Sequence, residues 1–449
     1  MGAASFDDFD GVVAELAGRA PEHRIEPSLQ RISRLCELLG DPQRTFPVIH
    51  VTGTNGKTST TRMIESLLRA FGLRTGMFTS PHLVDPRERI AFDARPISVP
   101  RFLDAWNDIA PYVDLVDEQS LAEGGIRLST FETYVGLAFA AFADAPVDVA
   151  IIEVGMGGSW DATNVADGQV CVITPIALDH AEYLGSTPAL IAREKAGIIK
   201  PGSLAVLARQ ELQAAEVLLE RCAVVDAAVA REGLEFDLLE RSPAVGGQVL
   251  TLRGLAGAEI DDVFLPLLGE HQGFNAALAL AATEGFLGGG GGPLDPIAIR
   301  AGFGSVTSPG RLEVAAHEPT VILDAAHNPH GARALAVAVN EAFLFDRVIG
   351  VLGVLADKDA IGILRELEPV LDEVIITRPT SPRAMAPADL ARLAAEVFGP
   401  NRVRVVESPA LAVDAARAAA GQAPGTGVVV TGSIVLIGQA KERLEVTSA

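Results

Sequence analysis

The sequence has little cysteine and few aromatic residues. Three cysteines occur in 449 residues (Cys36, Cys171 and Cys222), and aromatic residues make up 5% of the chain. The cysteines lie far apart, so the paired spacing of a zinc site or a redox dithiol is missing. We therefore expect no disulfides, as in proteins of a reducing cytosol.

Basic residues and long apolar runs are also scarce. There are 36 Lys and Arg residues against 58 Asp and Glu residues, a formal net charge of −22. Because nucleic acids and anionic membranes attract basic surfaces, we expect neither as a partner. No apolar run reaches the ~18 residues of a membrane span, and residues 1–20 lack a secretory signal. We expect a cytoplasmic protein that can still bind a phosphate locally, through backbone amides and one lysine.

Apolar runs that alternate with helical segments predict an α/β fold. A chain of 449 residues is long for one hydrophobic core, so its length predicts two or three domains. Residues 47–52, 147–154 and 170–174 are apolar runs, and residues 57–71 have helical spacing. Continuous apolar strands separated by helices indicate a mostly parallel sheet with helices on both faces. Residues 246–254 resemble a hairpin strand at a sheet edge or in a small subdomain.

The alternation starts again at residue 320. Candidate strands lie at 320–324, 347–353, 373–377, 403–407 and 427–432, with alanine-rich helices between them. This pattern predicts a second, smaller Rossmann-like domain. We place the boundary between residues 308 and 309, which gives domains of residues 1–308 and 309–449.

A glycine-rich segment, TGTNGKTS at residues 52–59, joins the first predicted strand to the first predicted helix. Its glycines let the backbone amides turn inward, a lysine can reach the outer phosphates of a nucleotide, and a hydroxyl can contact a metal ion. The common P-loop pattern has glycine where Val51 stands, so the match is partial. The alternative is a helix N-terminus with a solvated Lys57, but the combination favours nucleotide binding. The residues assigned to the nucleotide are Gly53, Thr54, Asn55, Gly56, Lys57, Thr58 and Ser59.

Polar residues also stand where the other apolar runs end. Glu153 lies in the run 147–154, and His180 follows the run 170–174. A carboxylate at the end of a parallel strand beside a P-loop is a usual Mg²⁺ ligand. Taken alone, a surface glutamate and a structural histidine remain alternatives, and the residues by themselves give Lys195 no role.

Seven further segments occur in order along the chain: SPHL (80–83), EVGMGG (153–158), DATN (161–164), ALDH (177–180), EKAGI (194–198), GRLE (310–313) and DAAHNP (324–329). Together with TGTNGKT, they resemble the successive signatures of the folylpolyglutamate synthase/dihydrofolate synthase family of the Mur ligase superfamily. The glycine-rich loop alone fits any Mur ligase, including a cell-wall amino-acid ligase, which is the alternative function. The SPHL, GRLE and DAAHNP segments favour the folate branch.

The resemblance implies an ATP-dependent ligase that adds L-glutamate to the carboxylate of a reduced folate through an acyl phosphate, with dihydropteroate as a further candidate substrate. It implies two magnesium ions, held by Ser80, Glu153, His180 and a carbamylated Lys195. Residues 1–308 would then be the ATP-binding domain with the folate-binding loops, and residues 309–449 the C-terminal ligase domain. The residues expected to be catalytic are Lys57, Glu153, His180 and Lys195. We expect a monomer.

The resemblance also extends to the rest of the ATP site and to the folate. The residues implied to contact ATP are Asn275, Arg311, Asp324 and His327, although Asn275 could instead cap a helix. The residues implied to contact the folate are Ser28 in the segment 25–31, Phe131 in the segment 129–132, and Asp161. The ring of Phe131 offers a stacking face for a flat heterocycle, and core packing is an equally good interpretation.

One position departs from the family pattern, because Ser159 stands where the family usually has arginine. Its loss removes a guanidinium that could orient a carboxylate, a role that Arg87 or Arg89 could take over. Two other functions remain to be weighed. A P-loop switch or transport ATPase would leave the second predicted sheet unexplained, and a non-catalytic scaffold would not need the full set of metal and phosphate ligands.

Overall fold

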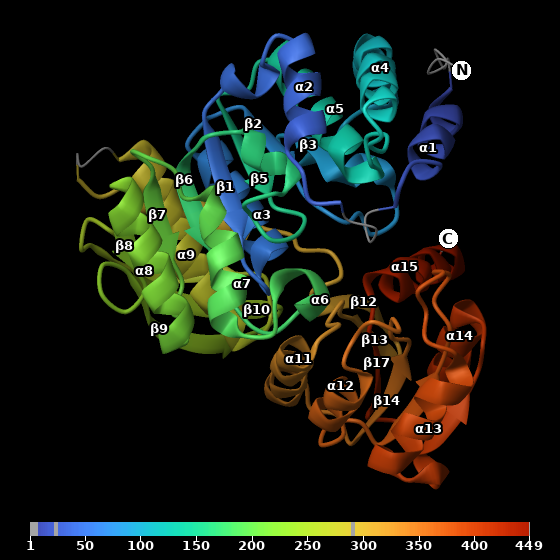
Figure 1. Cartoon of the computed structure of the whole chain (residues 1–449). Coiled ribbons are helices and arrows are strands. Elements are labelled where there is room, and N and C mark those ends of the chain that lie inside the picture. The colour runs from blue at the N-terminus through green and yellow to red at the C-terminus, as the bar shows by residue number, and fades with distance from the viewer. Residues whose placement is uncertain (1–7, 22–25, 289–291, 449) are drawn as a thin grey trace. The chain divides into compact units, whose positions relative to one another are not determined.

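The computed structural model describes residues 8–21, 26–288 and 292–448. They form two compact units (Figure 1). The first takes in the described residues of Met1–Glu240, Leu250–Val263 and Phe274–Val306, and the second those of Arg241–Val249, Phe264–Gly273 and Thr307–Ala449.

An eight-stranded sheet organises the first unit. Its strands are β1 (Val48–Thr52), β2 (Thr75–Phe78), β3 (Ile90–Phe92), β4 (Arg95–Pro96), β5 (Val149–Glu153), β6 (Gly168–Ile173), β7 (Leu204–Leu207) and β8 (Ala228–Arg231). The order is β4-β3-β2-β5-β1-β6-β7-β8. The pairs from β2 to β8 are parallel, whereas β3 and β4 pair antiparallel at one edge. The three apolar runs predicted as parallel strands are therefore β1, β5 and β6.

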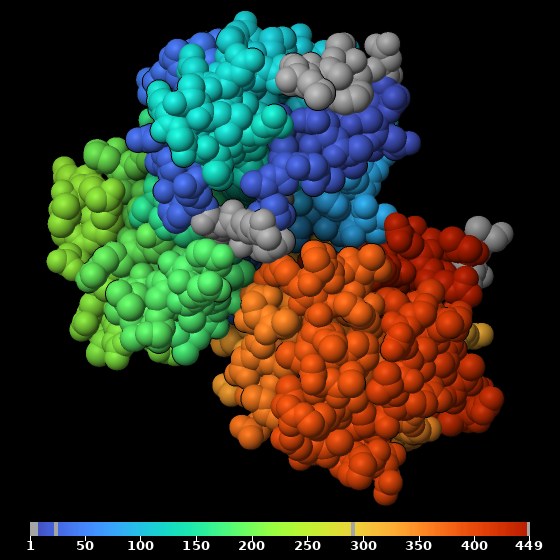
Figure 2. Space-filling model, turned by 45° about the vertical axis from the view of Figure 1, so that its right-hand side comes forward, coloured from blue at the N-terminus to red at the C-terminus, as the bar shows by residue number. Residues whose placement is uncertain are grey.

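Helices cover both faces of this sheet. Up to residue 304 they are α1 (Phe9–Ala17), α2 (Gln30–Leu38), α3 (Lys57–Ala70), α4 (Val99–Ala122), α5 (Thr130–Asp144), α6 (Ala181–Leu184), α7 (Pro188–Lys195), α8 (Leu212–Val225), α9 (Glu270–Leu287) and α10 (Pro296–Gly304). Val48, Ala150 and Ile152 face a core built with α2, α4 and α5. The opposite face receives α3, whose Met63 and Leu67 are fully buried, as its predicted apolar face requires. In the space-filling view, α1 lies against α4 (Figure 2).

A three-stranded sheet contributes residues to both units. Its strands are β9 (Asp237–Ala244), β10 (Gly247–Arg253) and β11 (Glu259–Leu265), in the order β11-β10-β9. The strand predicted at 246–254 is β10. The sequence pattern does not predict β9 and β11, which contain charged residues such as Glu240 and Asp261 and lack a continuous apolar run.

A six-stranded sheet organises the second unit. Its strands are β12 (Glu313–His317), β13 (Thr320–Leu323), β14 (Arg347–Leu352), β15 (Glu373–Ile376), β16 (Val403–Val405) and β17 (Thr426–Thr431). The order is β12-β13-β17-β14-β15-β16, with only β12 antiparallel to its neighbour. All five predicted strands are present, and the expected α/β fold class is confirmed.

Five helices accompany the second sheet: α11 (Pro329–Ala342), α12 (Ala360–Leu367), α13 (Pro387–Phe398), α14 (Pro409–Gly421) and α15 (Ile434–Ser448). The first three pack on one face, where Ile322, Leu352 and Ile376 lie in their core. In the part of the chain that the structure describes, no helix combines the length and the apolar character that crossing a membrane requires.

Candidate active site

The TGTNGKT loop runs from the end of β1 into the first turn of α3. Gly53 has φ +146°, and a Cβ atom there would lie 1.8 Å from Thr174 Oγ1. Gly56 has φ +88°, and a Cβ atom there would lie 2.6 Å from Asn275 Oδ1. Both positions therefore require glycine, for the backbone conformation and for the close approach of a neighbour.

The segment that follows β6 holds this loop in place. The Thr54 amide donates to the Pro175 carbonyl at 3.0 Å. The Thr54 hydroxyl donates to the Ala177 carbonyl and accepts from the Ala177 amide, each at 3.0 Å. No local sequence pattern reveals these contacts, because residues more than a hundred positions apart make them. They place the glycine-rich loop beside the segment that leads to His180.

Two lysines converge on one carbonyl oxygen of the loop. Lys57 Nζ donates to the carbonyls of Gly53 at 3.2 Å and Thr54 at 3.1 Å. Lys195 Nζ, from the end of α7, donates to the same Gly53 carbonyl at 2.6 Å. Lys195 is only 3% exposed. This burial, reinforced by the charge of Lys57, lowers the pKa of Lys195 to about 7.

The predicted carboxylate also reaches the loop. Thr58 Oγ1 donates to Glu153 Oε1 at 2.9 Å, and Glu153 is 1% exposed. The strand order β2-β5-β1-β6 brings the carboxyl ends of four neighbouring parallel strands to one edge. Ser80 follows β2, Glu153 ends β5, the glycine-rich loop follows β1, and His180 lies beyond β6. His180 caps α6 with φ +50°, and its Nε2 lies 3.9 Å from Asp179 Oδ1.

The described residues contain no group of three or more His, Cys, Asp or Glu side chains that could hold a metal ion. The magnesium site predicted from the sequence does not depend on such a group. Its predicted ligands comprise one carboxylate, one imidazole, the Ser80 hydroxyl and Lys195, whose carbamylation stays a prediction. Mg²⁺ usually keeps several waters and takes further oxygens from substrate phosphates. The donor set therefore fits an ion that bridges protein and nucleotide, and does not resemble an all-protein cage.

In the second unit, Asp324 joins the GRLE and DAAHNP segments. Its Oδ2 accepts from the Leu312 amide at 2.9 Å, and its Oδ1 accepts from the Ala326 amide at 2.8 Å. Burial raises the pKa of Asp324, and the charge of Arg311 opposes this shift. His327 Nδ1 lies 2.9 Å from the carbonyl oxygen two residues before it. The contacts of these residues with ATP remain a prediction.

Asn275 corrects one interpretation of the sequence. The alternative role as an N-cap is wrong, because α9 begins at Glu270 and Asn275 lies in its second turn. Asn275 is 4% exposed, and its amide occupies the space beside Gly56. The residue therefore packs directly against the glycine-rich loop.

The predicted folate residues differ in their surroundings. The ring of Phe131 lies 5.9 Å from that of Phe78, and a Cβ atom on Gly155 would be 2.5 Å from its Cζ. Phe131 is half-buried, and its ring takes part in these packing contacts. Ser28 accepts from the Gln30 amide at 3.1 Å, ahead of α2. Residue 25 of the segment 25–31 lies outside the described residues.

Asp161 is 3% exposed and binds its own loop. It accepts from the amides of Met156 at 2.9 Å and Thr163 at 3.0 Å. Burial raises the pKa of its carboxyl group to about 6. Its contacts therefore stabilise the turn that follows β5, and its role toward the folate remains a prediction.

The two arginines considered as replacements for the family arginine are engaged elsewhere. Arg87 Nε donates to both carboxylate oxygens of Asp85, at 3.1 and 3.0 Å. Arg89 is 4% exposed, donates to His82 Nδ1 at 2.8 Å and lies over the ring of Tyr134.

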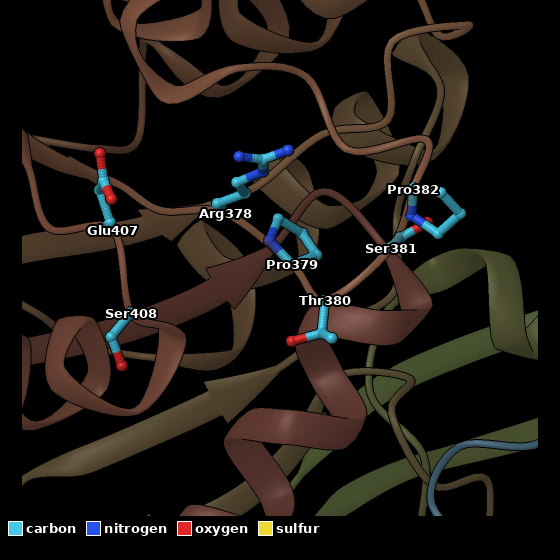
Figure 3. A pocket seen from close by; sticks show the side chains of 7 residues that line it. All are labelled: Arg378, Pro379, Thr380, Ser381, Pro382, Glu407 and Ser408. Atoms are coloured by element: carbon cyan, nitrogen blue, oxygen red, sulfur yellow. The ribbon is translucent and has the colours of Figure 1, made fainter.

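A surface pocket of about 560 Å³ lies in the second unit, where the chain leaves β15 and β16 (Figure 3). Arg378 and Thr380 line it on one side and Glu407 and Ser408 on the other. None of the predicted site residues is among its lining residues, so this pocket is separate from the site described above.

Comparison with known proteins identifies the family. Residues 310–434 match the Mur ligase, glutamate ligase domain, and residues 51–105 and 121–283 match the Mur ligase middle domain. The dihydrofolate synthase/folylpolyglutamate synthase of Mycobacterium tuberculosis is 52% identical over 444 residues, covering 94% of this chain and 91% of that protein. The chain belongs to the folylpolyglutamate synthase/dihydrofolate synthase family. The resemblance seen in the sequence motifs is thereby confirmed.

Other members agree in sequence and in structure. Folylpolyglutamate synthase of Lacticaseibacillus casei is 34% identical, over 92% of this chain and 94% of that protein. The solved structure of Mycobacterium tuberculosis folylpolyglutamate synthase complexed with ADP superposes with a TM-score of 0.92 at 51% identity, covering 96% of this chain and 97% of that one. E. coli FolC in complex with DHPP and ADP superposes with a TM-score of 0.85 at 31% identity, and the match covers 100% of both chains.

Proposed function

We propose that this chain is an ATP-dependent ligase that adds L-glutamate to the carboxylate of a reduced folate and releases ADP and phosphate. The observation that carries the proposal is the geometry of the glycine-rich loop. Two lysine amino groups share the Gly53 carbonyl, and the Thr58 hydroxyl contacts the buried Glu153. Two relatives of known structure hold ADP, which supports nucleotide binding here.

The reaction has two chemical steps. The folate carboxylate attacks the γ-phosphorus of ATP, which forms an acyl phosphate and releases ADP. The amino nitrogen of glutamate then attacks the acyl carbon, and phosphate leaves. The amides of the loop bind the phosphates. Lys57 exchanges its contacts with the loop carbonyls for the outer phosphate oxygens, where it balances the charge shared by attacking and leaving groups.

The proposed magnesium ligands are Ser80, Glu153, His180 and Lys195. Bound magnesium would neutralise charge on the phosphate oxygens during transfer. Lys195 would serve as a ligand in its carbamate form. Its neutral amine adds CO₂ and releases one proton, so the side chain then ends in an anion. Its near-complete burial supports this role, since a buried ammonium ion is costly and would repel a metal ion.

We also propose that the chain converts dihydropteroate to dihydrofolate. The relative that is 52% identical is named for both activities. In each reaction the acceptor is a carboxylate on a flat heterocyclic substrate, for which the half-buried ring of Phe131 offers a face. The names of the relatives disfavour the alternative of a cell-wall amino-acid ligase.

The domain boundary between residues 308 and 309 remains part of the proposal. It is supported by the compact unit that includes Thr307–Ala449 and by the match of residues 310–434 to a ligase domain. We further propose a monomer that works in the cytosol; light scattering of the purified chain measures its mass.

The test is a ligation assay with ATP, magnesium and radiolabelled glutamate, run with tetrahydrofolate and with dihydropteroate as acceptors. We expect acceptor-dependent ADP release and a mass gain of one glutamyl residue with each. Lys57→Met serves as the inactive control. Absence of acceptor-dependent ADP release from the wild-type chain would refute the proposal. If the chain turns over with tetrahydrofolate and not with dihydropteroate, the proposal is restricted to the addition of glutamate to reduced folates.

A further inference from the structure

We propose that Arg31 is a positioning residue for the folate substrate. Its guanidinium group joins the segment 26–31, which contains Ser28, to the first turn of α5, which contains Phe131. These are two of the stretches proposed to contact the folate, so the inference rests on the proposed function. Neither the glycine-rich loop nor the proposed magnesium ligands include Arg31.

The contacts of Arg31 reach two segments that are far apart in the chain. Its Nε donates to both carboxylate oxygens of Glu132, at 3.1 and 3.3 Å, across 101 positions of sequence. Its Nη2 donates to the Glu26 carbonyl at 3.2 Å, and its Nη1 to the Glu26 carboxylate at 3.4 Å. The side chains of Arg31 and Glu132 are 10% and 7% exposed, so solvent screens their attraction only weakly.

Glu132 also fixes the start of α5. Its Oε2 accepts from the Ser129 amide at 2.8 Å, and its own amide donates to Ser129 Oγ at 3.2 Å. These two bonds form a capping box, which sets the direction in which a helix begins. The same carboxylate therefore holds both Arg31 and the helical turn that carries Phe131.

The position of that turn matters beyond α5. The ring of Phe131 packs against the backbone of Gly155 and the ring of Phe78. Gly155 lies two residues after Glu153, in the segment that leads to Asp161. A shift of the first turn of α5 would thus move the aromatic face relative to the other proposed substrate residues. Displacements of about 1 Å can cost on the order of a hundredfold in rate.

The need for arginine follows from its shape. A guanidinium group is planar and presents several donors in a fixed fork, whereas a lysine ammonium ion acts as a compact charge. Arg31→Lys can keep the attraction to Glu132 but cannot at the same time bond the Glu26 carbonyl in this geometry. The neighbouring Arg34 pairs with Glu37 in the same helix and is 46% exposed. Arg34 is therefore a suitable control, because it lies in the same helix and does not connect two segments that are proposed to contact the folate.

The experiment compares steady-state kinetics of the full-length wild-type chain, Arg31→Lys, Arg31→Met, Glu132→Gln and the control Arg34→Gln. KM is measured separately for tetrahydrofolate and MgATP, and Tm is recorded for each variant. We expect Arg31→Lys to raise the KM for tetrahydrofolate about tenfold, the effect of losing a charge-assisted hydrogen bond, with the KM for MgATP unchanged. Arg34→Gln should leave both values unchanged.

The double variant Arg31→Met/Glu132→Gln tests whether the two residues act as a unit. If Arg31 and Glu132 act as a unit, the double variant should raise the KM for tetrahydrofolate no more than the single variant with the larger increase. Wild-type KM values in Arg31→Lys, or equal increases for both substrates with a lower Tm, would overturn the inference and leave a structural ion pair. A wild-type chain without folate-dependent turnover would overturn the proposed function, and with it the role of Arg31 in substrate affinity.

Discussion

Replacement of Gly53 by alanine tests the architecture of the nucleotide loop most directly. The added Cβ atom would lie 1.8 Å from Thr174 Oγ1, 2.8 Å from Thr174 Cβ and 2.9 Å from the Thr174 carbonyl oxygen. Rotation of the threonine side chain removes only the first of these contacts. Because β1 and β6 pair directly, the loop and Thr174 cannot separate without disturbing the sheet.

Two costs combine in Gly53→Ala. A non-glycine residue at φ +146° carries about 1–3 kcal/mol of backbone strain. Overpacking of a well-packed site costs about 1–3 kcal/mol more. We therefore expect a loss of about 2–6 kcal/mol in the free energy of unfolding, or a displaced loop that no longer binds nucleotide.

Two variants separate these costs. Gly72→Ala is the control for backbone conformation, since Gly72 has φ +85° and nothing lies within 4 Å of the position that an added Cβ atom would take. It should lose about 1–2 kcal/mol and keep ADP binding. In Gly53→Ala/Thr174→Ala the shortest contact is absent, so part of the stability should return.

The assays are urea unfolding and calorimetric titration with ADP. We expect Gly53→Ala to have the lowest stability or affinity, the double variant an intermediate value, and Gly72→Ala a value near wild type. If Gly53→Ala unfolds like Gly72→Ala and binds ADP with wild-type affinity, the loop does not depend on its close approach to Thr174.

Three further predictions concern polar groups in and beside the same sheet. Burial, aided by the charge of Lys200, lowers the pKa of His50 to about 3, so the folded chain keeps this ring neutral while the unfolded chain protonates near pH 6.5. The free energy of unfolding therefore decreases as the pH falls below 6.5. Urea unfolding at pH 7.5 and at pH 5.5 measures this decrease, which should be about 1.4 kcal/mol larger in wild type than in His50→Gln. Equal decreases in the two chains would contradict the prediction. Thr58→Val removes the hydrogen bond to Glu153 and should weaken MgATP binding about tenfold in calorimetry, whereas an unchanged Kd would contradict the role of that hydroxyl. Lys195→Ala should lower initial ligation rates by at least about a hundredfold, and wild type prepared without bicarbonate should regain activity when bicarbonate is added; an active Lys195→Ala would exclude the carbamate.

The sequence predicted features whose causes are local. The runs that became β1, β5 and β6 are apolar throughout, which is typical of strands buried on both faces. The apolar face of α3 and the glycine-rich turn before it were likewise readable from residue spacing. Charged strands such as β9 were not predicted, because a strand of a small sheet gains its stability from pairing partners that no local pattern reveals.

The contacts that shape the site could not be predicted, because they join residues distant in the sequence. Thr174 packs on Gly53, and the amide of Asn275 packs on Gly56. The sequence suggests that Asn275 contacts ATP or caps a helix, and spacing alone cannot show that α9 begins five residues earlier. The pairing of Arg31 with Glu132 belongs to the same class, since only the packing of α2 beside α5 brings the two residues together.

Ser159 shows how a departure from a family pattern acquires a physical meaning. Its hydroxyl donates to the Glu194 carbonyl at 3.0 Å, and its amide donates to the same oxygen at 3.0 Å. A Cβ atom on Gly197 would lie 2.5 Å from the Ser159 Cα atom, so the two backbones approach closely. An arginine at position 159 has no hydroxyl group, so it could not donate this hydrogen bond to the carbonyl of Glu194, the residue before Lys195. The serine therefore fixes the turn after Glu153 to the end of α7. Arg87 and Arg89 contact Asp85 and His82, and the substitution of either one for the family arginine stays a prediction.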